Sequence, residues 1–118
     1  MPRRSCRGSV TAETAVVLPV LVAITLGLVW LVTLAVAQVR VVDAARETAR
    51  AIARDEPAAA AVRLGERVGP SGSRITFDEA QGLVRVHVVA PVTGPGGVFG
   101  FLPPVEVQGE AVAAQEES

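Results

Sequence analysis

The sequence has few of the residues from which active sites and metal centres are built. Its 118 residues include one cysteine, one histidine, one tryptophan and no tyrosine. A single cysteine excludes an intramolecular disulfide and a metal site built from several thiolates. The formal net charge is −1, which gives no basic field for a nucleic acid. We therefore expect no cofactor, no metal site and no nucleic-acid partner.

Catalytic patterns are also missing. His87 stands alone on a predicted polar strand face, with no nucleophile at a recognisable spacing. Gly94–Gly97 lacks the lysine and hydroxyl residue of a phosphate-binding loop. The acidic pairs at 55–56 and 78–79 sit at predicted turns, where solvation explains them. We expect a protein that is not an enzyme, and a membrane-tethered enzyme is the weaker alternative.

One stretch has no charge at all. From Thr14 to Val39 there are 26 uncharged residues, preceded by Arg3, Arg4 and Arg7. At 1.5 Å per residue this helix is about 39 Å long, more than the roughly 30 Å of bilayer hydrocarbon. It is too long for the apolar part of a signal peptide, and no small-residue cleavage site follows it. We expect an uncleaved single-pass membrane anchor with a cytoplasmic N-terminus and an extracytoplasmic C-terminus. Whether Pro19 kinks the helix, and whether Trp30 meets lipid or a partner, stays open.

Behind the apolar run the periodicity stays helical to about Arg54. Apolar residues recur at three- and four-residue spacings, which predicts one buried face: Val39, Val42, Ala45, Ala49 and Ile52. Pro57 ends this pattern and can open a second short helix over residues 58–68. The segment 69–73 is rich in glycine, serine and proline, which indicates a turn.

From Arg74 onward the apolar period changes to two. Strands are predicted over 74–78, 83–89 and 105–113, with a hairpin loop over 79–82. Pro91 should stop the second strand or place its end at a sheet edge. One face collects the larger apolar side chains: Ile75, Phe77, Val84, Val86, Val88, Val105 and Val107. The amphipathic half of the long helix is the only long element able to cover it.

The expected fold class is therefore α+β. A long N-terminal transmembrane and amphipathic helix precedes a small three-stranded antiparallel β-meander. We divide the chain into a cytoplasmic leader (1–8), a stalk helix (9–55), a short helix with linker (56–72) and an extracytoplasmic β region (73–118). The loop of residues 94–104 carries Phe99 and Phe101, which either cover the sheet or form an exposed patch for a partner or membrane.

Glu13 is the residue that refines this description. A carboxylate beside an apolar run is costly unless it lies outside the lipid or has a partner. Gly8 stands behind the arginines, Ser9 follows it, and Glu13 is the fifth residue after Gly8. This arrangement resembles a prepilin of the type IV filament superfamily. The run from Gly8 to Leu21 and the continuation 38–54 look like the TadE branch, the pseudopilins of the tight-adherence (Flp/Tad) pilus.

The resemblance implies several properties. A prepilin peptidase would cut between Gly8 and Ser9 on the cytoplasmic side, and Glu13 would serve peptidase recognition and subunit register. Implied partners are that peptidase, other pilins, Tad assembly membrane proteins and membrane lipid. The implied role is a minor pilin in pilus assembly or adhesion. Thr14 departs from the family, where phenylalanine is common after the glutamate, so the subfamily stays open. The alternative is a signal-anchored membrane protein with a small extracytoplasmic binding module.

Overall fold

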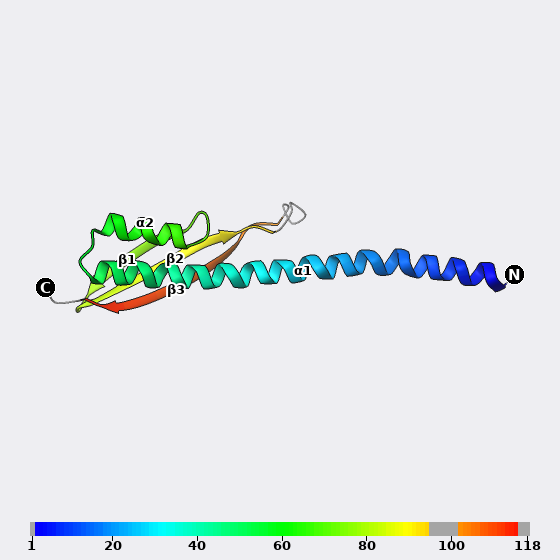
Figure 1. Cartoon of the computed structure of the whole chain (residues 1–118), viewed down its shortest axis with the longest axis horizontal. Helices are drawn as coiled ribbons and strands as arrows, with labels where there is room; N and C mark the ends of the chain where they lie inside the picture. The colour runs from blue at the N-terminus through cyan, green and yellow to red at the C-terminus, as the bar shows by residue number, and fades with distance from the viewer. Residues whose placement is uncertain (1, 95–101, 116–118) are drawn as a thin grey trace.

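A computed structural model gives the architecture of residues 2–94 and 102–115, with side chains described from residue 8 onward. The elements follow in chain order: α1 (Pro2–Ala53), α2 (Ala58–Val68), β1 (Arg74–Ala80), β2 (Leu83–Val92) and β3 (Val105–Ala114). The molecule measures 88 × 21 × 18 Å, because α1 extends far beyond a small domain at its C-terminal end (Figure 1). The predicted α+β class, with one long apolar helix before a three-stranded antiparallel sheet, is confirmed.

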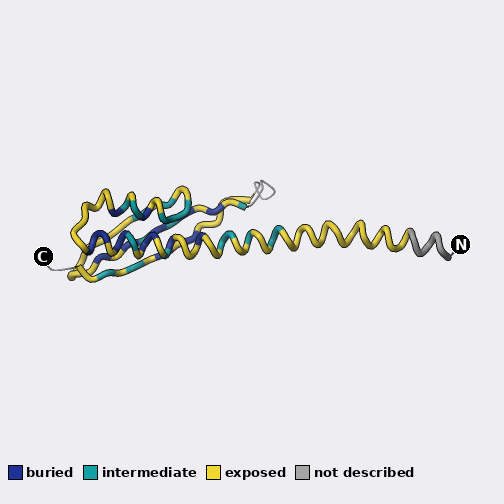
Figure 2. Tube along the Cα trace, in the orientation of Figure 1, coloured by how far each residue is buried: buried dark blue, intermediate teal, exposed yellow. Residues whose placement is uncertain are grey.

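Helix α1 changes its environment along its length but not its secondary structure. Residues 8–36 are exposed or half-buried, whereas the following four turns lie against the domain (Figure 2). The helix runs unbroken through Pro19. The hydroxyls of Thr14, Thr25 and Thr33 donate to the carbonyls four residues earlier, at 2.9–3.0 Å, so these polar groups are satisfied within the helix.

The C-terminal end of α1 is closed by a left-handed residue. Asp55 has φ 63°, its N–H donates to the Ile52 carbonyl, and the N–H of Glu56 donates to the Ala51 carbonyl. These two bonds make a Schellman motif, which satisfies carbonyls that a helix end leaves without partners. Glycine usually occupies the left-handed position, so an aspartate there is strained.

Helix α2 has the bounds that the sequence predicts, and it packs against α1 at a glycine. A Cβ atom placed on Gly65 would overlap the Thr48 hydroxyl and come within 2.7 Å of the Ile75 side chain. Thr48 is fully buried, and its hydroxyl donates to the Ala61 carbonyl at 3.5 Å. The two helices therefore approach as closely as they do because residue 65 has no side chain.

The sheet is a meander with strand order β1-β2-β3, and both pairings are antiparallel. The first hairpin is tighter than predicted. Glu79 and Ala80 belong to β1, and only Gln81 and Gly82 form the turn, at φ 56° and 75°. Two residues with positive φ make a primed turn, whose twist matches that of the flanking strands. The prediction of a four-residue loop over 79–82 was therefore wrong, because its first two residues belong to β1.

Strand β2 continues past the predicted end at Val89 to Val92, through Pro91. Arg74, the first residue of β1, pairs with Val89, so from Ala90 onward β2 pairs with β3 alone. The alternation of the ladder turns the nitrogen of Pro91 toward the side that β1 has left, where no donor is needed. Of the two alternatives predicted for Pro91, the structure therefore shows a strand end at a sheet edge and not a stop of the strand.

The predicted covering of the sheet is confirmed in its centre and wrong at three positions. Helix α1 packs on β2 and β3, and Val84, Val86 and Val88 are fully buried. Phe77 and Val105 are each 42% exposed, because one is on edge strand β1 and the other lies at the end of β3. Val39 is 60% exposed. The buried side of α1 is instead set by two neighbours, the sheet and α2, and it adds residues that one apolar stripe did not include: Ala37, Val41, Ala44, Thr48 and Ala51.

Candidate functional site

The predicted processing motif lies on the first turns of α1. Gly8, Ser9 and Glu13 are all exposed, and a Cβ atom on Gly8 would meet nothing within 4 Å. Ser9 and Glu13 are four residues apart, which places them on one face of the helix, separated by about 6 Å of axial rise. The structure thus leaves the whole motif accessible to another protein.

Glu13 has no cation within ion-pair distance among the side chains that the structure describes. It is followed by the uncharged run, so it marks the boundary between a charged and an apolar stretch of one helix. In water this exposed carboxylate needs no partner. Buried among apolar helices it would need one, because an unpaired charge in such surroundings is very unfavourable.

The helix behind this motif presents large apolar side chains outward. Val16 and Leu31 are 66% and 61% exposed, and similar fractions are found around the whole circumference. The 18-residue window of highest hydropathy has none of its residues buried, unlike the core helix of a soluble domain. α1 is therefore long and apolar enough to cross a membrane once.

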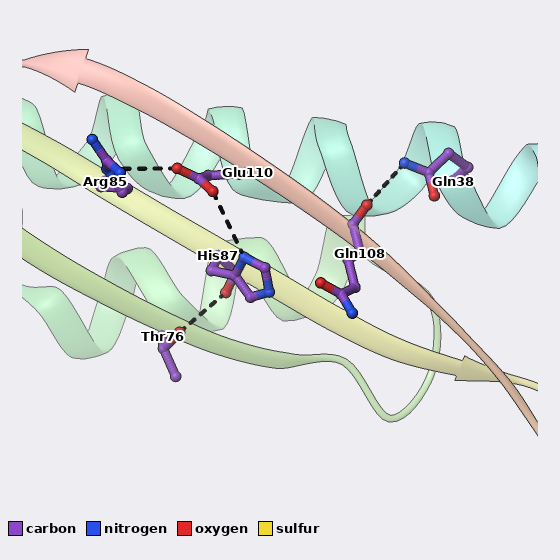
Figure 3. A network of polar contacts seen from close by, with 6 residues as sticks. All are labelled: Gln38, Thr76, Arg85, His87, Gln108 and Glu110. Carbon is purple, nitrogen blue, oxygen red and sulfur yellow. Dashed lines mark hydrogen bonds and ion pairs between the residues drawn. The ribbon is translucent and has the colours of Figure 1, made fainter.

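A second polar cluster lies on the sheet face that points away from the helices (Figure 3). Glu110 on β3 forms an ion pair with Arg85 at 3.5 Å and lies 4.0 Å from His87, and both of these residues are on β2. Farther along, Arg74 of β1 reaches across β2 to Glu106 at 3.0 Å. These side chains are 41–70% exposed, and such ion pairs contribute little to stability. The sequence predicted a polar strand face for His87 but gave no sign of Glu110 as its neighbour, because that contact depends on the β2–β3 register.

The outer edge of β3 is partly closed by the stalk. Gln38 of α1 donates its side-chain N–H to the Gln108 carbonyl at 2.8 Å (Figure 3). Nearby, Gly109 approaches the α1 backbone so closely that a Cβ atom would lie 2.8 Å from Val41 and Val42. Strand β3 and α1 are thus held together by a side-chain bond and by a backbone contact that needs a glycine.

The described residues contain no arrangement suited to metal chemistry. Nowhere within residues 8–94 and 102–115 do three His, Cys, Asp or Glu side chains meet as potential ligands. Phe99 and Phe101 lie outside the described residues. Leu102, the last apolar residue of their loop, is 47% exposed.

Comparison with known proteins agrees with the motif. No curated protein and no solved structure matches the chain. A family model described as TadE-like protein matches residues 8–50. The match begins at Gly8 and ends within the buried half of α1, so it covers the motif, the apolar run and the start of the domain contact. Residues 8–50 of this protein, the stalk helix as far as Arg50, are therefore similar to TadE-like proteins.

Proposed function

We propose that this protein is a minor pilin, or pseudopilin, of a Tad-type pilus, with a structural role and no catalysis. The observation that carries the proposal is the coincidence of the TadE-like match with a helix that exposes apolar side chains on all sides. Such a helix needs lipid or other helices around it. A pilin helix has both, first in the membrane and then in the filament.

The proposed processing step removes residues 1–8. Cleavage between Gly8 and Ser9 releases the arginine-rich leader with Cys6 and leaves the apolar run in the membrane. It also creates an α-amine at Ser9, one turn before Glu13. When helices of several subunits pack together, the amine of one can pair with Glu13 of the next. The pair neutralises a carboxylate that would otherwise be buried alone.

The proposed topology follows from the arginines. Arg3, Arg4 and Arg7 stay in the cytoplasm, so the domain of α2 and the three strands is extracytoplasmic. The partners are the prepilin peptidase, other pilins and the Tad assembly proteins of the membrane. The outer sheet face of this domain carries the exposed ion pairs of Glu110 with Arg85 and His87. It contributes contacts within the pilus machinery or to an adhesion target.

Mass spectrometry of the protein extracted from membranes tests the processing. In cells with an active prepilin peptidase we expect a chain that begins at Ser9, and in peptidase-deficient cells a chain that keeps residues 1–8. Retention of Met1–Gly8 in both strains would refute the proposal. It would favour a signal-anchored protein with a small binding module.

A charge-neutral variant tests the role of the carboxylate. Glu13→Ala should leave membrane insertion intact and abolish incorporation into pili, measured by immunoblotting of sheared filaments. Glu66→Ala is the matched control, because Glu66 is an exposed carboxylate on α2 without an ion-pair partner among the described side chains. Equal pilus incorporation of both variants would remove the proposed function of Glu13.

A further inference from the structure

A cleft of about 410 Å³ lies where α1 enters the domain. One wall is α1, and the others come from the turn before β1 and from the end of β2. Its lining comprises Val32, Thr33, Val36, Ala37, Arg40, Pro70, Ser71, Pro91, Val92 and Thr93. Neither the processing motif nor the polar sheet face contributes to it, so the proposed pilin function leaves this cleft without a role.

The polar groups of the cleft suit an anion. Arg40 is exposed and has no acidic partner within ion-pair distance among the described side chains. Ser71 and Thr93 add exposed hydroxyls, and no acidic residue lines the cleft. The Thr33 hydroxyl donates to the Val29 carbonyl, which leaves it able only to accept from a ligand. The cleft thus offers one guanidinium and two hydroxyl donors without a competing carboxylate.

The position of the cleft along α1 identifies the source of the anion. If the uncharged run from Thr14 to Val39 is centred in a bilayer, a hydrocarbon core of about 30 Å ends near Val36. Arg40 then lies about 6 Å above that boundary, within the headgroup layer, which is several ångströms thick. Val32 and Val36 lie at or below the boundary, at acyl-chain level. Val105 at the start of β3 pairs with Val92, which lines the cleft, so another uncharged residue lies at this end of the domain.

We propose that this cleft binds the phosphate of an anionic glycerophospholipid from the outer leaflet. The Arg40 guanidinium pairs with the phosphate, since its planar donors match phosphate oxygens. Ser71 and Thr93 donate to the headgroup. The apolar wall of Val32, Val36 and Val92 accepts the start of an acyl chain. A bound lipid would fix the height of the domain above the membrane until the subunit leaves the bilayer.

This inference rests on the membrane anchoring in the proposed function, but its test is separate. The full chain is purified from membranes, reconstituted in nanodiscs of one part phosphatidylglycerol to three parts phosphatidylcholine, and analysed by native mass spectrometry. We expect the wild-type chain to retain one phosphatidylglycerol. Arg40→Gln should reduce that occupancy about tenfold, as expected for the loss of one charged contact. Arg46→Gln, six residues farther from the membrane on the same helix, should retain it.

Further arms make each outcome decisive. Ser71→Leu narrows the cleft while keeping Arg40, and it too should lose the lipid; far-UV circular dichroism verifies that each variant is folded. Equal occupancy in Arg40→Gln and wild type would overturn the proposal, as would equal loss in Arg46→Gln. Displacement by inorganic phosphate at the same concentration as the lipid would identify a free phosphate site and overturn the lipid as its source. A chain that inserts into nanodiscs but retains no lipid refutes this site alone, whereas a chain that fails to insert refutes the membrane anchor.

Discussion

The two halves of α1 belong to one uninterrupted helix, yet they meet opposite environments. The half from residue 8 to 36 carries valine and leucine side chains on its surface, and many of these side chains are more than 50% exposed. The half from Ala37 to Ala53 buries mostly alanines, with Val41, Thr48 and Ile52 as its larger members. Large side chains thus occur where no part of the chain that the structure describes covers them, and small ones where strands and α2 pack against the helix. The first half is suited to lipid or other helices, and the second to close backbone approach within its own domain.

The largest expected effect concerns this close approach. Gly109→Val would place a branched side chain 2.8 Å from the α1 backbone, which cannot move aside easily. We expect the free energy of unfolding to fall by about 3 kcal/mol or more. The matched change in the exposed half, Gly27→Val, should leave it unchanged, because a Cβ atom there meets nothing within 4 Å. Thermal melts followed by circular dichroism in one detergent compare the two; similar melting temperatures would contradict the packing described.

The opposite pattern is expected for membrane insertion. Ile24→Arg places a charge near the centre of the uncharged run and should weaken insertion by about 3–4 kcal/mol, because arginine is unfavourable there and the favourable isoleucine is lost. Val39→Arg adds the same charge at the exposed end of the run and should insert normally, because it lies at headgroup level. Resistance to alkaline carbonate extraction measures both. If the Val39 variant is extracted as readily as the Ile24 variant, the assigned span is misplaced.

A smaller effect is expected at the contact between the helices. Gly65→Ala should lower the free energy of unfolding by about 2 kcal/mol, since the new methyl group overlaps the Thr48 hydroxyl. Thr48→Ala removes that hydroxyl at a cost of about 1 kcal/mol. The double variant should then be more stable than the sum of the two losses predicts. Strict additivity in denaturant unfolding would show that the two residues do not meet.

The smallest expected effect is a stabilisation at the end of α1. Asp55→Gly should raise the free energy of unfolding by about 1 kcal/mol, because glycine adopts the φ of 63° without strain. Asp78→Gly is the control, since Asp78 lies within strand β1, where glycine is unfavourable. A lower stability of Asp55→Gly would indicate that its carboxylate contributes more than its backbone strain costs.

Much of this arrangement could be predicted because the relevant signals are local. The absence of charge over residues 14–39 predicts the span, and the change of apolar period at Arg74 predicts the sheet. Pro57 correctly separates α1 from α2. The motif of Gly8, Ser9 and Glu13 led to the TadE-like family that residues 8–50 match. Each of these features is contained in one short stretch of sequence.

The errors concern relations between distant stretches. Val39 and Val41 are both valines at plausible core positions, but Val41 is buried and its backbone lies against Gly109 of β3, whereas Val39 is exposed. The alternation of side chains along β1 places Phe77 on the covered face, but on this edge strand the helices do not shield it fully. The partner of Arg85 and the cleft at Arg40 likewise depend on register and on how the helices lie over the sheet. A single sequence read for local periods contains no signal for these.

The unbroken backbone of α1 determines how the domain is rotated about the axis of this helix. From the span to the first turns covered by the sheet there is no hinge, so rotation of the span about its axis is transmitted fully to the strands. One residue inserted near Ala35 would turn the domain by about 100° and raise it by only 1.5 Å. The sheet face bearing Arg85 and Glu110 would then face a different neighbour around the helix axis, at nearly the same distance from the membrane. In a helical assembly, the number of residues between the span and the domain would therefore fix the rotational orientation of the domain in every subunit.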